Sequence, residues 1–230
     1  MFINQTNIDI KSIELKSNGF LRIEDFLDVK FAERIHACLV GEVDWDLACR
    51  INGESKKIKN CNDVTDLSDQ YKDELKANSE DFQFIYNSYM MVTAYIENKT
   101  PDLFLNRLLE FLNSPETVSF FKKLTNNQAI KKLNAQATRY KVGHYLTQHN
   151  DHDDVEDREY AYVIGLTEDW RPEWGGLLHV INENDEIIKT FVPKFNTLTI
   201  FKVPQNHYVS YVNPLAKRDR LSITGWLLSN

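Results

Sequence analysis

The stretch Tyr140-Lys-Val-Gly-His-Tyr-Leu-Thr-Gln-His-Asn-Asp151 decides how the rest of this chain is interpreted. It contains a turn signal at Gly143 and then a predicted strand that ends in His149-Asn-Asp151, an H-x-D pair. In extended backbone the side chains of His149 and Asp151 point the same way, so one strand end can present both to one metal ion. The pair alone is a weak signal, because two polar residues at this spacing occur by chance in many loops.

A third ligand has to come from a distant part of the chain. His207 follows Pro204 at the start of a predicted strand, as a neighbouring strand of the same sheet would require. Two imidazoles and one carboxylate on one face of a metal form the facial triad of non-haem Fe(II) oxygenases, which leaves coordination positions open. We therefore predict His149, Asp151 and His207 as metal ligands and catalytic residues. His152 is the rival ligand, and the other histidines, His36, His144 and His179, are interpreted as surface, packing or pocket-lining residues.

The run Arg220-Leu-Ser-Ile-Thr-Gly-Trp226 lies downstream of His207 and alternates, so that Arg220 and Ser222 share one strand face. A guanidinium fork and a hydroxyl on one face suit a carboxylate. A buried arginine without an anion would be costly. Arg220 is therefore predicted to hold a dicarboxylate. Two alternatives stay open: Arg220 could be a surface residue of an edge strand, and Arg218 in the preceding turn could be the anchor.

From Leu133 onward the hydrophobic pattern has a period of two residues, which is typical of strands. Turn signals such as Gly175-Gly176 and Pro214 separate the runs. About eight short strands at regular spacing predict a sandwich or jelly roll. The predicted strands are 133–141, 145–149, 159–166, 177–182, 187–192, 197–201, 207–212 and 220–228.

The N-terminal half carries helix signals but no chemical motif. We expect one domain over residues 1–230, in which residues 1–130 are a mostly helical support and residues 131–230 form the β core with the site. The fold class is thus mainly β, with a core buttressed by N-terminal helices. The expected elements are an extended stretch over 1–27, a helix capped by Asp28, a possible strand over 43–51, a short helix around Leu67, Tyr71 and Leu75, one or two strands over 82–96, and helices starting at Thr100-Pro101 and Ser114-Pro115.

Composition excludes several classes of function. The net charge is −7 and no stripe of Lys and Arg is present, which argues against nucleic-acid binding. The 3 cysteines have no C-x-x-C spacing and are interpreted as reduced thiols. The first residues lack the features of a signal peptide, and no apolar run is long enough to cross a bilayer. We therefore predict a cytoplasmic protein, with no membrane partner and with the oligomeric state left open.

The H-x-D pair, Trp174-Gly-Gly-x-Leu178, His207 and the strand from Arg220 together resemble the prolyl 4-hydroxylase-like group of Fe(II)/2-oxoglutarate oxygenases. The resemblance covers residues 133–228. It implies a double-stranded β-helix that holds iron through the three ligands and uses O2. It also implies that 2-oxoglutarate chelates the iron while Arg220 binds its distal carboxylate, with ascorbate as a possible further cofactor. Tyr140 matches a tyrosine that hydrogen-bonds that carboxylate in relatives, and Gly165 replaces a larger residue, which implies a roomier co-substrate pocket.

The activity that the resemblance implies is a 2-oxoglutarate-dependent dioxygenase. Such an enzyme decarboxylates 2-oxoglutarate with O2 and hydroxylates an unactivated C–H bond, here of a prolyl or other peptidyl residue. The alternatives are a hydroxylase of a free amino acid or small metabolite, and a β-helix that binds a metal or ligand without turnover. The complete triad together with Arg220 favours catalysis. Aromatic residues in 82–95, with Trp170 and Trp174, could line a substrate groove or belong to the core.

Overall fold

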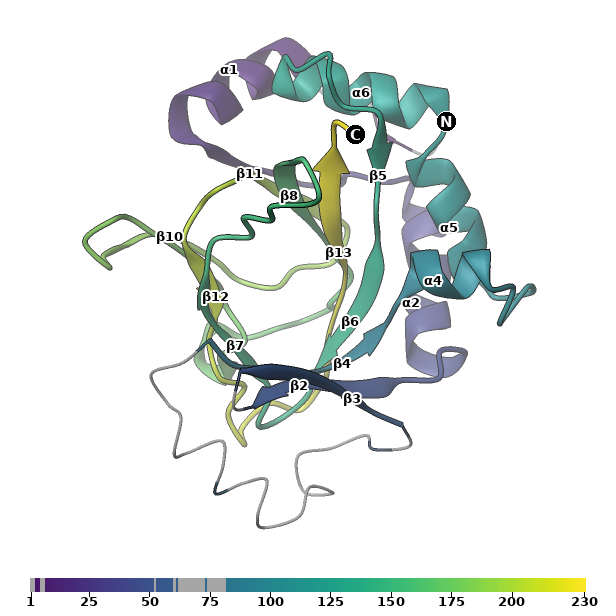
Figure 1. Cartoon of the computed structure of the whole chain (residues 1–230), viewed down its shortest axis with the longest axis vertical. Coiled ribbons are helices and arrows are strands. Elements are labelled where there is room, and N and C mark those ends of the chain that lie inside the picture. The colour runs from purple at the N-terminus through teal and green to yellow at the C-terminus, as the bar shows by residue number, and fades with distance from the viewer. Residues whose placement is uncertain (1–2, 5–6, 52, 60, 62–72, 74–81) are drawn as a thin grey trace.

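The computed structural model describes residues 3–4, 7–51, 53–59, 61, 73 and 82–230. In this part of the chain an antiparallel sheet curls on itself, and helices lie along one side of it (Figure 1). The predicted fold class, a mainly β jelly roll with flanking helices, is confirmed. The short helix predicted around Leu67, Tyr71 and Leu75 falls outside the described residues.

The curled sheet has two walls. Its strand order is β1-β11-β8-β13-β6-β4-β7-β12-β9-β10. The first wall consists of β1 (Phe20–Ile23), β11 (Thr197–Lys202), β8 (Arg158–Gly165), β13 (Arg220–Leu228) and β6 (Gln136–Tyr140). The second consists of β7 (Tyr145–His149), β12 (His207–Val209), β9 (Leu178–Ile181) and β10 (Ile187–Phe191).

One strand joins the two walls. β4 (Phe84–Tyr89) pairs with β6 through its C-terminal residues and with β7 through Phe84 and Ile85. On its other side β4 pairs with β2 (Asp46–Ile51), which forms a hairpin with β3 (Glu54–Ile58). The N-terminal part of the chain therefore supplies strands to the sheet as well as helices.

The strands predicted over 145–149 and 220–228 have the observed bounds of β7 and β13. The run predicted over 133–141 is divided into β5 (Lys132–Leu133), which pairs with the end of β13, and β6. The strand predicted over 207–212 ends at Val209.

Two helices begin where the cap signals predicted. The side chain of Asp28 accepts a hydrogen bond from the Phe31 amide at the start of α2 (Val29–Gly41). Ser114 does the same with the Thr117 amide at the start of α6 (Pro115–Thr125). A side-chain oxygen at this position satisfies one of the free amides of the first turn, which fixes the start of the helix.

Three expectations in the N-terminal half were wrong. The stretch 1–27 contains a helix, α1 (Ile8–Asn18), which starts at the cap residue Asn7 and ends at Gly19 with φ 77°. The aromatic run over 82–96 contains a single strand, β4, and then the short helix α4 (Met91–Ile96). α5 (Phe104–Leu112) begins after Leu103 rather than at Pro101, because Thr100 and Pro101 form a preceding turn whose carbonyls accept from the Asn106 amide side chain.

The core has two main parts. The larger cluster fills the space between the helices and the outer face of the first wall, and includes Ile35, Leu39, Leu108 and Phe121, all fully buried. The second cluster lies between the two walls. Burial of this much apolar surface is what holds the helices against the sheet. No helix in the described part of the chain combines the length and the apolar character needed to span a bilayer.

Candidate metal centre and co-substrate pocket

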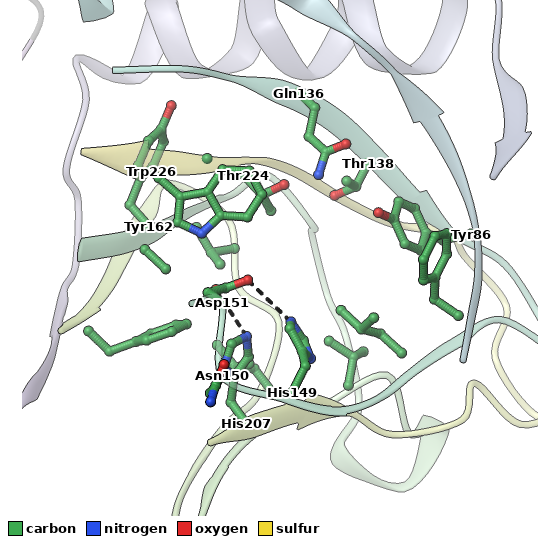
Figure 2. Close-up of a pocket in the computed structure, with 18 of the residues that line it drawn as sticks. Tyr86, Gln136, Thr138, His149, Asn150, Asp151, Tyr162, His207, Thr224 and Trp226 are labelled. Carbon is green, nitrogen blue, oxygen red and sulfur yellow. Dashed lines mark ion pairs between the residues drawn. The ribbon is translucent and has the colours of Figure 1, made fainter. Parts of the chain in front are cut away.

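β7 and β12 bring two histidines to the same place in the sheet. His149, the last residue of β7, is paired in register with His207, the first residue of β12, and their ring centroids are 4.1 Å apart. Asp151 lies between them: its Oδ1 is 3.4 Å from His149 Nε2 and its Oδ2 is 3.4 Å from His207 Nε2 (Figure 2). All three residues can offer ligand atoms within 4.8 Å of one another.

Asp151 reaches this position by a backbone conformation that the spacing argument did not foresee. Its φ is 61°, in the left-handed region, so the chain turns immediately after β7 instead of continuing as a strand. Aspartate is one of the few residues that adopt this conformation at low cost. The carboxylate therefore faces the histidines because of a turn, and the prediction of an extended backbone at Asp151 was wrong.

The backbone fixes which nitrogen of each imidazole faces the cluster. His149 Nδ1 lies 2.9 Å from the Thr147 carbonyl oxygen, and His207 Nδ1 lies 2.8 Å from that of Gln205. Because a carbonyl can only accept, each Nδ1 carries the proton and each Nε2 is left with a lone pair in the neutral ring. Hydrogen bonds of this kind orient histidine ligands in metal sites.

The charges of the cluster also suit a divalent metal. Burial lowers the pKa of His207 to about 4, His149 adds to the lowering, and Asp151 opposes it. Burial would raise the pKa of Asp151, but its interactions with His149 and His207 hold that pKa below its usual value. At neutral pH His207 is therefore neutral and Asp151 is ionised. Two imidazoles and one carboxylate are a donor set that fits Fe(II).

The cluster opens into a cavity of about 620 Å³ between the two walls. Arg220 lines the same cavity and is only 5 % exposed. Its Nη1 donates to the Gly176 carbonyl at 2.9 Å, and its guanidinium carbon lies 4.9 Å from the centre of the Tyr140 ring. Among the described residues no carboxylate lies within ion-pair distance of Arg220. A buried cation without an anion is costly, so this end of the cavity is suited to an incoming carboxylate.

Tyr140 and Ser222 lie on the strands beside Arg220. Tyr140 is paired in register with Arg220, and its ring stacks on Tyr86 with 5.1 Å between the centroids. The Ser222 hydroxyl is 2.8 Å from Thr138 Oγ1. Tyr140 and Thr138 line the main cavity, whereas Ser222 lines a smaller one that adjoins it. The co-substrate role of Tyr140 and Ser222 stays a prediction.

The other residues considered as metal ligands or as the carboxylate anchor lie outside the site or contact other groups. His152 has a side chain 62 % exposed and contacts Asp154, and Arg218 contacts Asp169 at the surface. Gly165 does not enlarge the pocket: a Cβ there would lie 2.4 Å from the Lys194 carbonyl oxygen, so the missing side chain makes room for backbone. The remaining histidines contact the Leu166 carbonyl (His36), the Lys141 amide (His144) and Thr190 (His179).

Arg158, at the start of β8, is a site residue that the sequence did not reveal. It forms ion pairs with Asp153 at 3.1 Å and Glu156 at 2.9 Å, and its Nη1 donates to the Asp151 carbonyl at 3.3 Å. Its guanidinium also lies 3.8 Å from the centre of the Trp226 ring, whose nitrogen faces Asp151 in Figure 2. The acidic run from Asp153 to Glu159 is therefore not simply solvated, because Asp153 and Glu156 are paired with Arg158.

A row of aromatic side chains from the stretch 82–86 forms one side of the cavity. The rings of Phe82, Phe84 and Tyr86 follow one another at centroid distances of 5.8 and 5.3 Å, and all three line the cavity. Phe82 also contacts the His149 ring at 5.2 Å. Trp170 and Trp174 instead pack edge to face in the buried cluster between the walls. Phe82, Phe84 and Tyr86 therefore line the cavity, whereas Trp170 and Trp174 belong to the core.

Comparison with known proteins shows what this part of the chain is similar to. Residues 135–228 match the family model of the 2OG-Fe(II) oxygenase superfamily. Prolyl 3-hydroxylase OGFOD1 of Xenopus laevis is 30% identical over 114 residues, which are 46% of this chain and 22% of that protein. The mouse protein of the same name is 26% identical over 100 residues, which are 41% and 18% of the two chains. This chain thus spans about a fifth of the length of the curated relatives it matches.

Solved structures share the fold. A prolyl-4-hydroxylase of Pseudomonas putida is similar with a TM-score of 0.61 and 15% identity, over 96% of this chain and 98% of that one. A Trichoplax adhaerens prolyl hydroxylase in complex with a hypoxia inducible factor peptide fragment is similar with a TM-score of 0.63 and 16% identity, over 96% and 89%. The resemblance inferred from the motifs is confirmed.

Proposed function

We propose that this chain, whose residues 135–228 match the 2OG-Fe(II) oxygenase superfamily, is an Fe(II)- and 2-oxoglutarate-dependent dioxygenase that hydroxylates an unactivated C–H bond. One observation carries the proposal: the His149, Asp151 and His207 cluster and the buried Arg220 open into the same cavity. 2-Oxoglutarate has a 2-oxo acid at one end and a carboxylate at the other. A cavity with a metal-binding cluster and a cation that lacks an anion matches both ends.

Each of the three clustered residues has a role in this proposal. His149 and His207 would hold iron through Nε2, and Asp151 through a carboxylate oxygen. When bound, iron and 2-oxoglutarate supply the oxidising chemistry, in which O2 is consumed and succinate and CO2 are released. The chain's own contribution is to hold the metal with neutral imidazoles, to orient the co-substrate and to keep the reacting centre away from bulk water.

Arg220 would bind the distal carboxylate of 2-oxoglutarate. The guanidinium is held by the Gly176 carbonyl and by the face of the Tyr140 ring, so its orientation is set before the co-substrate arrives. A pre-oriented fork loses little entropy on binding a carboxylate. The Tyr140 hydroxyl would donate a hydrogen bond to the same carboxylate. Ser222 would act through Thr138, which it contacts and which lines the cavity.

The substrate we propose is a prolyl or other peptidyl residue. The row formed by Phe82, Phe84 and Tyr86 supports this, because an apolar ring such as that of proline packs well on aromatic faces. Phe82, at one end of the row, is 37 % exposed and so is available to a large substrate. The similarity to prolyl hydroxylases points the same way.

Two further expectations belong to the proposal. A cytoplasmic location is supported by the cysteines Cys38, Cys49 and Cys61, which are buried in the fold outside any disulfide and suit a reducing compartment. A single domain over residues 1–230 is supported by β1 and β4, which come from the N-terminal part and are strands of the same sheet.

The proposal is tested by succinate formation. The protein is incubated with Fe(II), 2-oxoglutarate and O2, with proline-containing peptides in one series and free amino acids in another. We expect succinate with the peptides and a mass increase of one oxygen on the peptide. Turnover with free amino acids alone would assign the substrate to the small-molecule class. Metal binding without succinate in any series, including slow turnover without substrate, would instead indicate a binding protein. Asp151→Ala is the control that should abolish turnover.

A further inference from the structure

Arg22 lies on β1, the strand that the N-terminal part adds at the edge of the first wall. It is paired in register with Thr199 on β11. Its Nε donates to Thr199 Oγ1 at 3.0 Å and its Nη1 to the Val192 carbonyl at 2.7 Å. The guanidinium carbon lies 4.7 Å from the centre of the Phe191 ring. These contacts hold the head group over the sheet instead of leaving it free in water.

Arg22 and Arg220 both line one small cavity of about 20 Å³. That volume is close to the minimum needed for one water molecule. Val163 and Leu178 line this cavity and the main one, as Arg220 does, so the two adjoin at the arginine. The other polar lining is made of hydroxyl side chains, from Thr167, Thr197, Thr199 and Ser222, with Lys194 at the rim.

The two arginines share a cavity without an anion between them. In the part of the chain that the structure describes, neither has a carboxylate within ion-pair distance. Burial is the main cause that lowers the pKa of Arg22 to about 10; Glu24 opposes the shift and Arg220 adds to it. The nearby Glu24 is itself paired with Lys194 at 2.5 Å. Two like charges in a partly buried place repel each other, and an anion from outside would relieve that repulsion.

We propose that Arg22 is a second positioning residue for 2-oxoglutarate, which acts on the distal carboxylate across the small cavity behind Arg220. This inference rests on the proposed function of the site. Arg220 contacts the carboxylate from the main cavity, and Arg22 adds its charge from behind through one water molecule. The pair of charges would make the site selective for 2-oxo acids with a second carboxylate over those with an apolar end.

The test is a binding measurement that needs no turnover. Mn(II)-loaded protein without O2 is titrated calorimetrically with 2-oxoglutarate and with 2-oxopentanoate, which has a methyl group in place of the distal carboxylate. We expect Arg22→Gln to raise the dissociation constant of 2-oxoglutarate about tenfold, because one of two charges on the carboxylate is lost. The affinities for Mn(II) and for 2-oxopentanoate should stay within about twofold of wild type, since neither contact involves that charge. Arg22→Lys should lose only about threefold, because the charge returns without the fork.

Two controls separate charge from structure. Lys194→Gln removes an exposed charge at the rim of the same cavity and should leave both 2-oxo acid affinities near those of wild type. If Arg22→Gln does not fold, Arg22→Met takes its place in the titration, because methionine keeps the packing on Phe191. A lower unfolding temperature with unchanged 2-oxoglutarate affinity would assign Arg22 a structural role and overturn the inference. Equal losses for both 2-oxo acids would also overturn it. If wild-type protein binds Mn(II) but neither acid, the proposed function fails, and this inference with it.

Discussion

The two ends of the main cavity are built in different ways. The metal end comes from one pair of strands and the turn that follows: His149 and His207 are register partners on β7 and β12, and Asp151 is two residues beyond β7. The anion end is assembled from strands far apart in the chain, with Arg220 on β13 and Tyr140 on β6, and the proposed Arg22 comes from β1 and lines the small cavity that adjoins it. The local spacing of His149 and Asp151 can be recognised in a sequence, whereas the place of Arg22 near Arg220 follows from topology and becomes visible only in the fold.

The largest effect is expected at the metal end, where His207→Ala removes one of three ligands. Loss of a residue that only orients a ligand already costs 10–100-fold in metal affinity, so loss of a ligand should cost on the order of 100-fold or more. Titration with Fe(II) or Mn(II) in the absence of O2 measures this. His152→Ala is the matched control and should bind metal like wild type, because His152 is exposed and contacts Asp154. Metal retained in His207→Ala but lost in His152→Ala would show that the cluster has a different third ligand.

The next effect tests the anion end. Arg220→Ala should weaken 2-oxoglutarate binding by about 2–5 kcal/mol, because a charge-assisted pair is lost and the carboxylate is left unpaired. The apparent Michaelis constant for 2-oxoglutarate should therefore rise well over tenfold, while metal affinity is unchanged. Arg220→Lys should recover part of the loss.

The control for this prediction is Arg218→Ala. Arg218 contacts Asp169 and its side chain is 49% exposed, so the variant should resemble wild type. If Arg218→Ala abolished 2-oxoglutarate binding and Arg220→Ala did not, the anchor would have been misassigned.

The sequence predicted the fold best where one local rule acts. The alternation of residues fixed the bounds of β7 and β13, and side-chain caps fixed the starts of α2 and α6. It failed at α1, where only Leu15 is buried and no apolar stripe signals a helix. It also failed at α4, whose residues favour strands but pack Met91 and Ala94 against the core as a helix. There tertiary contacts override intrinsic propensity.

The site shows the same difference between what a local sequence pattern predicts and what tertiary contacts decide. The short spacing of His149 and Asp151 was enough to propose a metal cluster, although the turn at Asp151 was not foreseen. Arg22 stands between Leu21 and Ile23 in an ordinary alternating strand, and nothing in that pattern says which strand it will lie beside. Arg158 was hidden in a run of acidic residues, because its contacts with that run depend on how the loop folds back.

Substitution of Arg158 tests the metal end with an expected effect of intermediate size. Arg158→Met keeps most of the packing on Trp226 but removes the charge that holds Asp153, Glu156 and the Asp151 carbonyl. The loop that carries Asp151 should become less fixed, and metal affinity should fall about tenfold, as for other residues that orient a ligand. Competition with a metal chelator measures the change.

The matched control for Arg158 is Asp154→Asn. The Asp154 side chain is 95% exposed, and its charge is screened by water and salt, so metal affinity should be unchanged. If the Arg158 and Asp154 variants both bound metal like wild type, the loop would not need its ion pairs to present Asp151.

The smallest effect is expected for Ser222→Ala. The hydroxyl of Ser222 is bonded to Thr138, so its loss should lower the free energy of unfolding by about 1 kcal/mol. Denaturation in urea measures this, and 2-oxoglutarate affinity should change by about twofold or less, because the contact is indirect. Thr138→Val should have a similar effect on stability, and the double variant should cost less than the sum. A loss of 2-oxoglutarate affinity above tenfold would make Ser222 a direct contact and extend the anion end by one residue.

The pairing of β4 with both walls bears on how far this fold can be shortened. β4 bridges β6 and β7, and β1 covers the edge of β11, yet both strands precede the segment 135–228 that matches the family. Excised alone, that segment would present unpaired backbone along three strands, and bare strand edges pair readily with other chains. The fragment that carries every family motif would therefore be prone to aggregate, and the smallest soluble form has to include the strands that no motif marks.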